Sequence, residues 1–371
     1  MKITIITSPF GLLPPEGYGA VEKLWYDIAK ELASHDNDVT LVAKKSDLDI
    51  NNEGLKIKGI KGYKRTKSIY IDLFFDLLYS INAVIQSDKS DILMLNTFWS
   101  PIVMKFFPWK SKKVVYNVQR IPKGQFKYYK NIDQFYCVSS SVVSFLYKEQ
   151  PSFLPKITRI GNPVNTNDYQ FYQPREADGV IKILYFGRIH PEKGLEILIN
   201  AVQILKQKQE AIELHLLGPY KTTQGGGGEK YKEQLNRLAV DFNIIWHEPV
   251  SENSKLSAQL EKSDIFCYPS VAEMGETFGV APIEAMATGR STIVSDLACF
   301  KDFVIDGKNG LIFNHRAENP ENELVEKLEK LIKDKTFRDD IAKKGASSAM
   351  DFSVKKIAKL YLQDFHKLLN K

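Results

Sequence analysis

Short apolar runs alternate with segments of helical spacing along the whole chain, and this alternation restricts its fold more than any other feature. In the first half, strands are expected at residues 2–8, 38–43, 55–60, 91–95, 113–118 and 134–139. In the second half they are expected at 181–187, 212–217, 243–247, 264–268, 291–295 and 310–313. Three helices, at about 319–333, 336–350 and 353–370, close the chain. Strands that alternate with helices predict doubly wound parallel sheets of the α/β class.

The length of the chain predicts two domains. Its 371 residues, 43% of them apolar, are enough to build two hydrophobic cores. The two series of strands are separated by a polar, turn-rich stretch at about 160–178, where we expect the linker. We therefore predict an N-terminal domain of residues 1–165, a second domain of residues 166–352 and a C-terminal helix within residues 353–371.

The composition favours a cytoplasmic protein. No run of eighteen apolar residues occurs, so no transmembrane helix is predicted. The apolar run of residues 1–8 is too short for a signal peptide and is expected to be a strand. The three cysteines (Cys137, Cys267 and Cys299) are odd in number and far apart, which suits buried thiols in a reducing compartment better than a disulfide framework or a zinc site.

Positive charge is concentrated in the first half of the chain. Residues 1–165 hold 23 Lys and Arg against 15 Asp and Glu, a net charge of +8, whereas the remainder holds 28 against 30. This excess indicates an anionic partner, but no nucleic-acid-binding pattern accompanies it. Aromatic residues mix with lysines at 98–113 and 123–130, as in segments that dock on anionic lipid. Core aromatics beside solvated lysines would give the same composition, and the oligomeric state stays open.

A loop rich in Pro and Gly, residues 9–19, follows the first predicted strand and precedes a helix. It contains Gly17 and Gly19, and its place makes it a candidate for binding a nucleotide or phosphate. The pattern is neither GxGxxG nor a P-loop, so dinucleotide binding and ATP hydrolysis are not favoured. An ordinary strand-to-helix turn remains the alternative.

Two glutamates, Glu276 and Glu284, stand eight positions apart between two strand-like runs. If a helix begins near Phe278, Glu276 lies before its first turn and Glu284 about two turns in. Loops of this kind lie at the carboxyl edge of an open α/β sheet, where ligands bind. One extended ligand could then reach both carboxylates. The alternative is a solvated glutamate followed by a glutamate on a helix surface.

Two cations, Arg188 and Lys193, lie between the strand that ends at Gly187 and a helix that begins near Gly194. Cations beside a helix N-terminus can bind a diphosphate and neutralise a nucleoside-diphosphate leaving group without a metal. A surface arginine and a surface lysine would look the same in the sequence.

Taken in order, these motifs resemble the retaining glycosyltransferases of family 4, which have the GT-B fold. The resemblance rests on Gly187-Arg188 with Lys193-Gly194, on Leu216–Pro219, and on Glu276–Gly289. Further similar segments are Pro14–Glu22, Cys137–Ser139 and Asp306–Gly310, so the resemblance covers nearly the whole chain.

The resemblance implies two Rossmann-like domains with the active site in the cleft between them. A nucleotide sugar would bind to the C-terminal domain and the acceptor to the N-terminal domain, on which the last helix would pack. Arg188 and Lys193 would bind the diphosphate, and Glu284 the ribose hydroxyls. Glu276 would face the donor sugar. The other donor-binding positions would be Gly17, Gly19, Gly187, Pro249, Val250, Phe278, Gly279 and Val280, the last three through backbone N–H groups.

The sequence departs from the family pattern at three positions. Gln119 (or Asn117) stands where members often carry a histidine near the donor sugar, Glu248 where a glycine is common near the base, and Ala20 where a second glycine often follows. The loss of the histidine does not abolish the chemistry usually described for the family, in which the departing phosphate takes the acceptor proton. An amide at position 119 can still hydrogen-bond a sugar hydroxyl.

The sequence thus predicts a metal-independent retaining glycosyltransferase without a cofactor, peripheral at the inner face of the membrane if the basic domain binds lipid. It would transfer a hexose-type sugar from a UDP- or GDP-sugar to a glycan or glycolipid during synthesis of cell-surface polysaccharide or lipopolysaccharide. Two short DxD patterns, at 36–38 and 47–49, lie in polar surroundings and are read as chance. An epimerase or phosphorylase on the same fold, or a sugar-binding module without catalysis, remains possible. The base, sugar, acceptor and linkage are left open.

Overall fold

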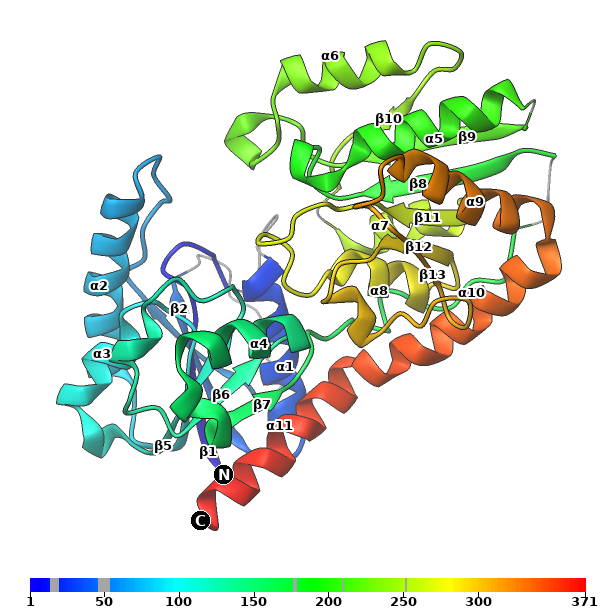
Figure 1. Ribbon diagram of the computed structural model, residues 1–371. Coiled ribbons are helices and arrows are strands. Elements are labelled where there is room, and N and C mark those ends of the chain that lie inside the picture. Colours follow the sequence, from blue (N-terminus) through cyan, green and yellow to red (C-terminus); the bar gives the residue numbers. More distant parts are fainter. Residues whose placement is uncertain (14–19, 46–53, 176–178, 209, 251) are drawn as a thin grey trace. The chain divides into compact units, whose positions relative to one another are not determined.

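The chain divides into two compact units in the computed structural model, which describes residues 1–13, 20–45, 54–175, 179–208, 210–250 and 252–371 (Figure 1). Unit 1 comprises Met1–Pro163 together with Val354–Lys371. Unit 2 comprises Val164–Ser353. The last helix therefore belongs to the same unit as the N-terminus, although more than 180 residues separate it from the rest of that unit in the sequence.

Unit 1 is built on a seven-stranded parallel sheet in the order β3-β2-β1-β4-β5-β6-β7. Its strands are β1 (Lys2–Ile6), β2 (Asp38–Lys44), β3 (Lys56–Ile60), β4 (Ser90–Leu95), β5 (Ser111–Val118), β6 (Gln134–Cys137) and β7 (Ile157–Arg159). The six strands predicted for this half are confirmed. The edge strand β7 was not predicted, because three residues are too few to give a period-two pattern.

The helices of unit 1 are α1 (Ala20–Ala33), α2 (Ile69–Gln86), α3 (Ser100–Val103), α4 (Ser140–Glu149) and α11 (Val354–Leu369). Helix α11 packs on α1, where the rings of Trp25 and Tyr361 lie 5.7 Å apart. Asn117 donates to the Tyr361 hydroxyl over 3.1 Å, and the Tyr136 hydroxyl donates to Asp364 over 2.7 Å. The predicted packing of the C-terminal helix on the first domain is thus confirmed.

Helix α2 is long and apolar enough, by length and composition, to cross a membrane, and it is the one such helix in the described part of the chain. No membrane-spanning helix was predicted here because Asp72 and Asp76 interrupt the apolar sequence. Asp76 is buried and accepts from the backbone N–H groups of Phe98 and Trp99, so the polar side of the helix is fixed to the segment after β4.

Unit 2 is built on a six-stranded parallel sheet in the order β10-β9-β8-β11-β12-β13. Its strands are β8 (Ile181–Phe186), β9 (Ile212–Leu217), β10 (Ile245–His247), β11 (Ile265–Tyr268), β12 (Ser291–Ser295) and β13 (Leu311–Phe313). Its helices are α5 (Leu195–Gln207), α6 (Glu229–Leu238), α7 (Asn253–Glu261), α8 (Val280–Ala287), α9 (Pro320–Lys333) and α10 (Lys335–Ala349). All six predicted strands and the closing helices are present, with ends that differ by one or two residues.

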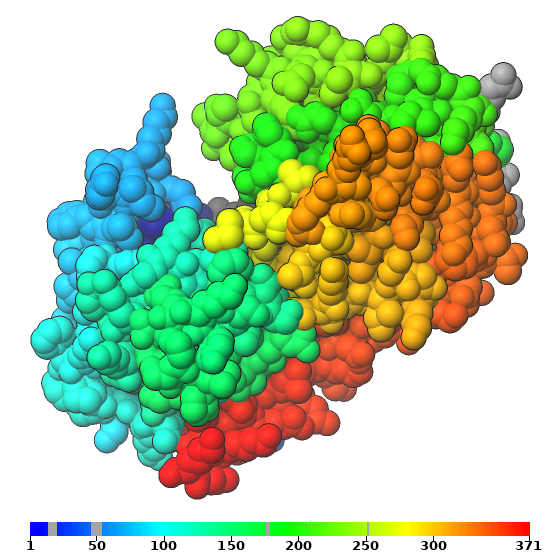
Figure 2. Space-filling model, viewed as in Figure 1, coloured from blue at the N-terminus to red at the C-terminus, as the bar shows by residue number. Residues whose placement is uncertain are grey.

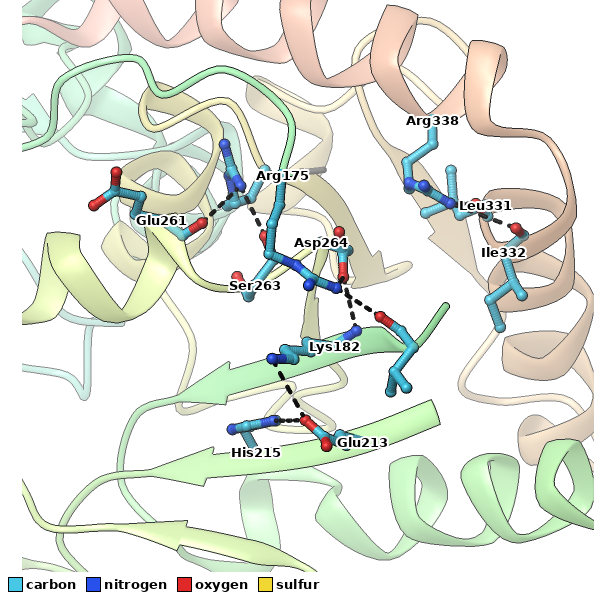
Figure 3. Close-up of polar contacts among 12 residues, drawn as sticks. Arg175, Lys182, Glu213, His215, Glu261, Ser263, Asp264, Leu331, Ile332 and Arg338 are labelled. Atoms are coloured by element: carbon cyan, nitrogen blue, oxygen red, sulfur yellow. Dashed lines mark hydrogen bonds and ion pairs between the residues drawn. The ribbon is translucent and has the colours of Figure 1, made fainter. Parts of the chain in front are cut away.

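The described part of the predicted linker after Pro163 is packed against unit 2 rather than extended in solvent. Arg175 forms an ion pair with the buried Asp264 over 2.9 Å, and Asp264 also accepts from the backbone N–H of Lys182 (Figure 3). The buried Arg290 donates to the carbonyl oxygens of Tyr172 and Ser263. Arg290 also donates to the carbonyl oxygen of Gln173, so one arginine side chain gives the backbone of this stretch two hydrogen-bond partners.

Candidate functional site

The carboxyl edge of the unit 2 sheet brings several predicted residues together, because all its strand pairs are parallel. Gly187 and Gly218 follow β8 and β9 with φ angles of 148° and 149°. A Cβ atom on Gly218 would lie 1.8 Å from the carbonyl oxygen of Gly187. Glycine is therefore required where these two loops cross, and this close approach positions the segment that carries Arg188.

A buried ion pair lies at this edge. Lys193 ends the 3-10 turn Pro191–Lys193, and its Nζ atom is 2.7 Å from an Oε atom of Glu276. The two side chains are only 7% and 11% exposed. Gly194, with a φ of 65°, separates Lys193 from α5, which begins at Leu195. Glycine is needed there because a Cβ atom would lie 2.2 Å from the carbonyl oxygen of Pro269, in the loop after β11. The sequence predicted both residues, but not that they pair.

Two stacked tyrosines lie beside Glu276, one of them bonded to its carboxylate and the other to the carbonyl oxygen of Arg188. The Tyr268 hydroxyl donates to Glu276 over 3.2 Å, and its ring stacks on Tyr185 at 5.6 Å between centroids. Burial, and secondly the charge of Glu276, raises the pKa of each tyrosine well above its usual value, so both act as neutral hydrogen-bond donors. Sequence reasoning missed this pair. A usable signal was present, because both residues lie at the ends of strands predicted at 181–187 and 264–268.

Arg188 is also bound to a carboxylate. Its guanidinium pairs with Glu192 and donates to the carbonyl oxygen of Gly225 over 2.9 Å. Its side chain is 45% exposed, so it remains accessible to a ligand from solvent. The two predicted diphosphate-binding cations are thus each held by a glutamate, and an anionic ligand would have to replace Glu192 and Glu276 in those pairs.

Helix α8 begins two residues later than predicted. Gly279 precedes it with a φ of 84°, and a Cβ atom there would lie 2.4 Å from the ring of Phe300. This left-handed residue delays the helix to Val280, so Glu284 lies about one turn into α8 and not two. The Phe278 ring is buried against Phe303, so only its backbone could serve a ligand, and that role stays a prediction.

A charged network holds the loop that carries Glu276. Glu273, in that loop, contacts His315 over 3.0 Å and pairs with Arg316. The same two residues contact Asp296, which follows β12, and the distance from Arg316 to Asp296 is 2.7 Å. The loop is therefore tied to the ends of β12 and β13. Nothing in the sequence pattern singled out this network, because its members come from three separate loops.

The remaining predicted positions are not part of this cluster. Pro249 and Val250 follow β10 and are half-buried. Gln119 follows β5 in unit 1, where its amide exchanges two hydrogen bonds with Asn162, over 2.9 and 3.1 Å. Gly17 and Gly19 lie outside the described residues. Among the described residues, no group of three or more His, Cys, Asp or Glu side chains is placed to hold a metal, and metal independence stays a prediction.

Comparison with known proteins assigns the class of this fold. Residues 168–348 match the model of the family described as glycosyl transferases group 1. The chain also shares its fold with sucrose-phosphate synthase from Thermosynechococcus elongatus, with a TM-score of 0.79 at 16% identity over 100% of this chain and 99% of that one. A second similar structure is Anabaena HepE in complex with UDP and glucose, with a TM-score of 0.73 at 16% identity over 99% of both chains. The architecture is that of GT-B proteins.

The curated relatives are named as glycosyltransferases. The lipopolysaccharide 1,2-N-acetylglucosaminetransferase of Salmonella typhimurium is 24% identical over 93% of both chains. A D-inositol 3-phosphate glycosyltransferase of Arthrobacter is 25% identical over 51% of this chain, and a phosphatidyl-myo-inositol mannosyltransferase of Mycobacterium tuberculosis is 30% identical over 34%. The matched region spans only 43% and 31% of those two proteins. Most of unit 2 thus matches the group 1 glycosyltransferase family.

Proposed function

We propose that this protein transfers a sugar residue from a nucleoside-diphosphate sugar to a glycan or lipid-linked acceptor, with retention of configuration. The observation that carries the proposal is the Lys193–Glu276 pair at the carboxyl edge of the group 1 domain. It holds a cation for a diphosphate and a carboxylate for a sugar 2.7 Å apart, both shielded from water. Charged groups in such a dry setting act more strongly on a developing charge than they do in water.

Donor binding would rearrange the two ion pairs. A diphosphate carries more negative charge than a glutamate, so it competes for Lys193 and for the exposed Arg188. Its binding would release the Glu276 carboxylate to accept hydrogen bonds from sugar hydroxyls. In this proposal Glu284 binds the ribose, the backbone N–H groups of residues 278–280 face the donor, and Pro249 and Val250 contact the base.

The proposed chemistry is a front-face displacement. The bond between the anomeric carbon and the diphosphate oxygen breaks, and the acceptor oxygen bonds to the same face of that carbon. The departing phosphate oxygen takes the acceptor proton, so no protein base is required. Arg188 and Lys193 stabilise the negative charge on the leaving group without a metal. The Gln119 amide, once it exchanges its bonds to Asn162, can bind a sugar hydroxyl.

The named relatives suggest where to look for substrates. One is named for lipopolysaccharide and N-acetylglucosamine, and two for inositol-containing acceptors, one of them a lipid. HepE was solved with UDP and glucose. We therefore propose a UDP- or GDP-hexose as donor and a cell-surface glycan or glycolipid as acceptor. The three free buried cysteines suit a cytoplasmic location.

A ligand panel tests the proposal most directly. UDP, GDP, ADP, dTDP and their common sugar conjugates would be added to the purified chain, and its melting temperature recorded. A nucleotide at one hundred times its Kd should stabilise the protein by about 2.7 kcal/mol. If no nucleotide or nucleotide sugar raises the melting temperature or is hydrolysed, the proposal fails.

Two variants separate the proposed roles. Glu276→Gln should lower turnover by roughly a hundredfold or more without loss of nucleotide affinity, because it removes a charge near the reacting sugar and leaves Lys193 to the diphosphate. Glu284→Ala should instead weaken nucleotide binding. Glu326→Ala, on the exposed face of α9, is the matched control and should change neither.

Product that forms only when an acceptor is present excludes an epimerase, and loss of turnover without loss of binding excludes a sugar-binding module.

A further inference from the structure

Helix α2 presents an apolar stripe to the outside of unit 1. The side chains are spaced alternately by three and four residues, which places them along one face of a helix about 27 Å long. They are Ile71, Phe74, Leu78, Ile81 and Ile85, each between 38% and 56% exposed. Single exposed apolar residues are ordinary, but a stripe of five on one helix marks an interaction surface.

The opposite face of α2 is fixed to the unit by polar contacts. Asp76 accepts from the backbone N–H of Trp99 over 3.0 Å, and the hydroxyls of Ser80 and Thr97 lie 2.9 Å apart. The Tyr79 hydroxyl donates to a carbonyl oxygen of β2. These groups would lose their partners if α2 left the unit to span a bilayer. Because α2 stays attached to unit 1, a partner can contact only its outward face and cannot surround the helix.

Exposed aromatic residues extend this surface beyond the C-terminal end of α2. Phe106 and Trp109 are 71% and 62% exposed, on the 3-10 turns Met104–Phe106 and Pro108–Lys110. Lys110 donates to the carbonyl oxygens of Ile85 and Ser87, which ties these turns to the end of the helix. Figure 2 shows α2 and the segment that follows it, in blue to cyan, on the surface of unit 1.

Cations accompany both ends of the stripe. Residues 54–71 contain six Lys and Arg and no Asp or Glu, and residues 92–132 contain eight and none. Lys64, Arg65 and Lys67 are exposed just before α2, and Lys105 is exposed beside Phe106. The chain thus places positive charge next to both ends of this apolar surface.

We propose that the outward face of α2, with Phe106 and Trp109, docks flat on a lipid bilayer that carries anionic headgroups. The apolar side chains would enter the boundary between headgroups and acyl chains while the lysines contact lipid phosphates. A second copy of the chain fits this face less well. Pairing two α2 helices in either direction brings the cations at their ends together, whereas anionic lipid neutralises them. The surface agrees with a lipid-linked acceptor, but docking itself requires neither donor nor transfer.

Co-sedimentation of the full chain with vesicles tests this proposal. Vesicles of phosphatidylcholine alone would be compared with vesicles containing about one third phosphatidylglycerol. We expect binding to the anionic vesicles that weakens as salt is added. The double variant Phe106→Ser/Trp109→Ser should lower the partition coefficient at least roughly tenfold. Phe74→Ser/Ile81→Ser should act similarly, and Lys105→Glu should lower it at least about fivefold.

Leu154→Ser is the matched control, since Leu154 is a 54% exposed apolar residue of unit 1 outside this surface. It should bind vesicles as the unaltered chain does, and circular dichroism melts should show all variants folded. The proposal is overturned if the unaltered chain does not bind anionic vesicles, or if the docking variants bind them as tightly as Leu154→Ser does. It is also overturned if Phe74→Ser/Ile81→Ser instead dissociates a dimer that does not bind vesicles.

Failure of this proposal can be told apart from failure of the transferase proposal. The docking variants should keep their thermal stabilisation by nucleotide, because their changes lie on α2 and on residues 104–110. Glu284→Ala should lose that stabilisation and still bind vesicles.

Discussion

The two sheets have the same doubly wound architecture, but their carboxyl edges hold different chemistry. In unit 2 the edge contains oppositely charged pairs, of which Lys193–Glu276 is the most buried. In unit 1 the corresponding contacts join neutral groups, such as Gln119 with Asn162 and Ser80 with Thr97, and its buried carboxylates, Asp76 and Glu22, have no salt bridge among the described residues. A buried ion pair is poised to exchange partners with a charged ligand, whereas a neutral amide pair suits sugar hydroxyls. The contrast agrees with a donor side in unit 2 and an acceptor side in unit 1.

The largest effect is expected from breaking the unit 2 ion pair on one side. Lys193→Met leaves Glu276 buried without its cation and should lower the free energy of unfolding by about 3–5 kcal/mol. The double variant Lys193→Met/Glu276→Gln should recover most of that stability, because no buried charge remains. Urea unfolding of both variants measures these free energies. Neither variant should show sugar transfer. If the double variant is no more stable than Lys193→Met, the pair is not energetically coupled.

A smaller, pH-dependent effect is expected at Asp76 in unit 1. Burial raises the pKa of this carboxyl to about 6 in the folded chain. Its hydrogen bonds from backbone N–H groups and from Ser80 lower the pKa, but by less than burial raises it. Between pH 4 and pH 6 the unfolded chain has lost this proton while the folded chain keeps it. Stability from this group is therefore present at low pH and falls as pH rises through about 6, by up to about 3 kcal/mol.

Melting temperatures recorded from pH 4.5 to 7.5 measure this loss. Asp76→Asn should flatten the fall, since an amide does not titrate. Asp72→Asn, four residues earlier on the same helix and partly exposed, is the control and should leave the slope unchanged. Equal slopes in the unaltered chain and in Asp76→Asn would contradict the prediction.

The smallest effect is expected for the neutral pair of unit 1. Asn162→Ala should lower the free energy of unfolding by about 1 kcal/mol. It removes two hydrogen bonds of the Gln119 amide, and water can partly replace them. A double-mutant cycle with Gln119→Ala measures the coupling between the two amides. A cost as large as that of Lys193→Met would erase the contrast between the two sheet edges.

Sequence reasoning recovered most of the elements and only part of the site. Strands such as β1 and β8 are apolar runs with clear ends, so their positions follow from composition. It also identified Glu276, Lys193 and Arg188 as residues of one sheet edge. It missed Tyr185 and Tyr268 because buried aromatic residues at strand ends look like ordinary core. It placed Glu284 a turn too deep because a glycine before a helix does not reveal its φ angle.

The sequence by itself determined the α/β class, the two series of strands and the charges available at the second one, because hydrophobic periodicity and motif order are local properties. Only the tertiary structure decided which charges meet. Lys193 and Glu276 are 83 residues apart and become partners because β8 and β11 are neighbours in a parallel sheet. It likewise decided that one side of α2 is fixed to unit 1 through Asp76 while its other apolar side faces outward, since burial depends on what packs against a helix.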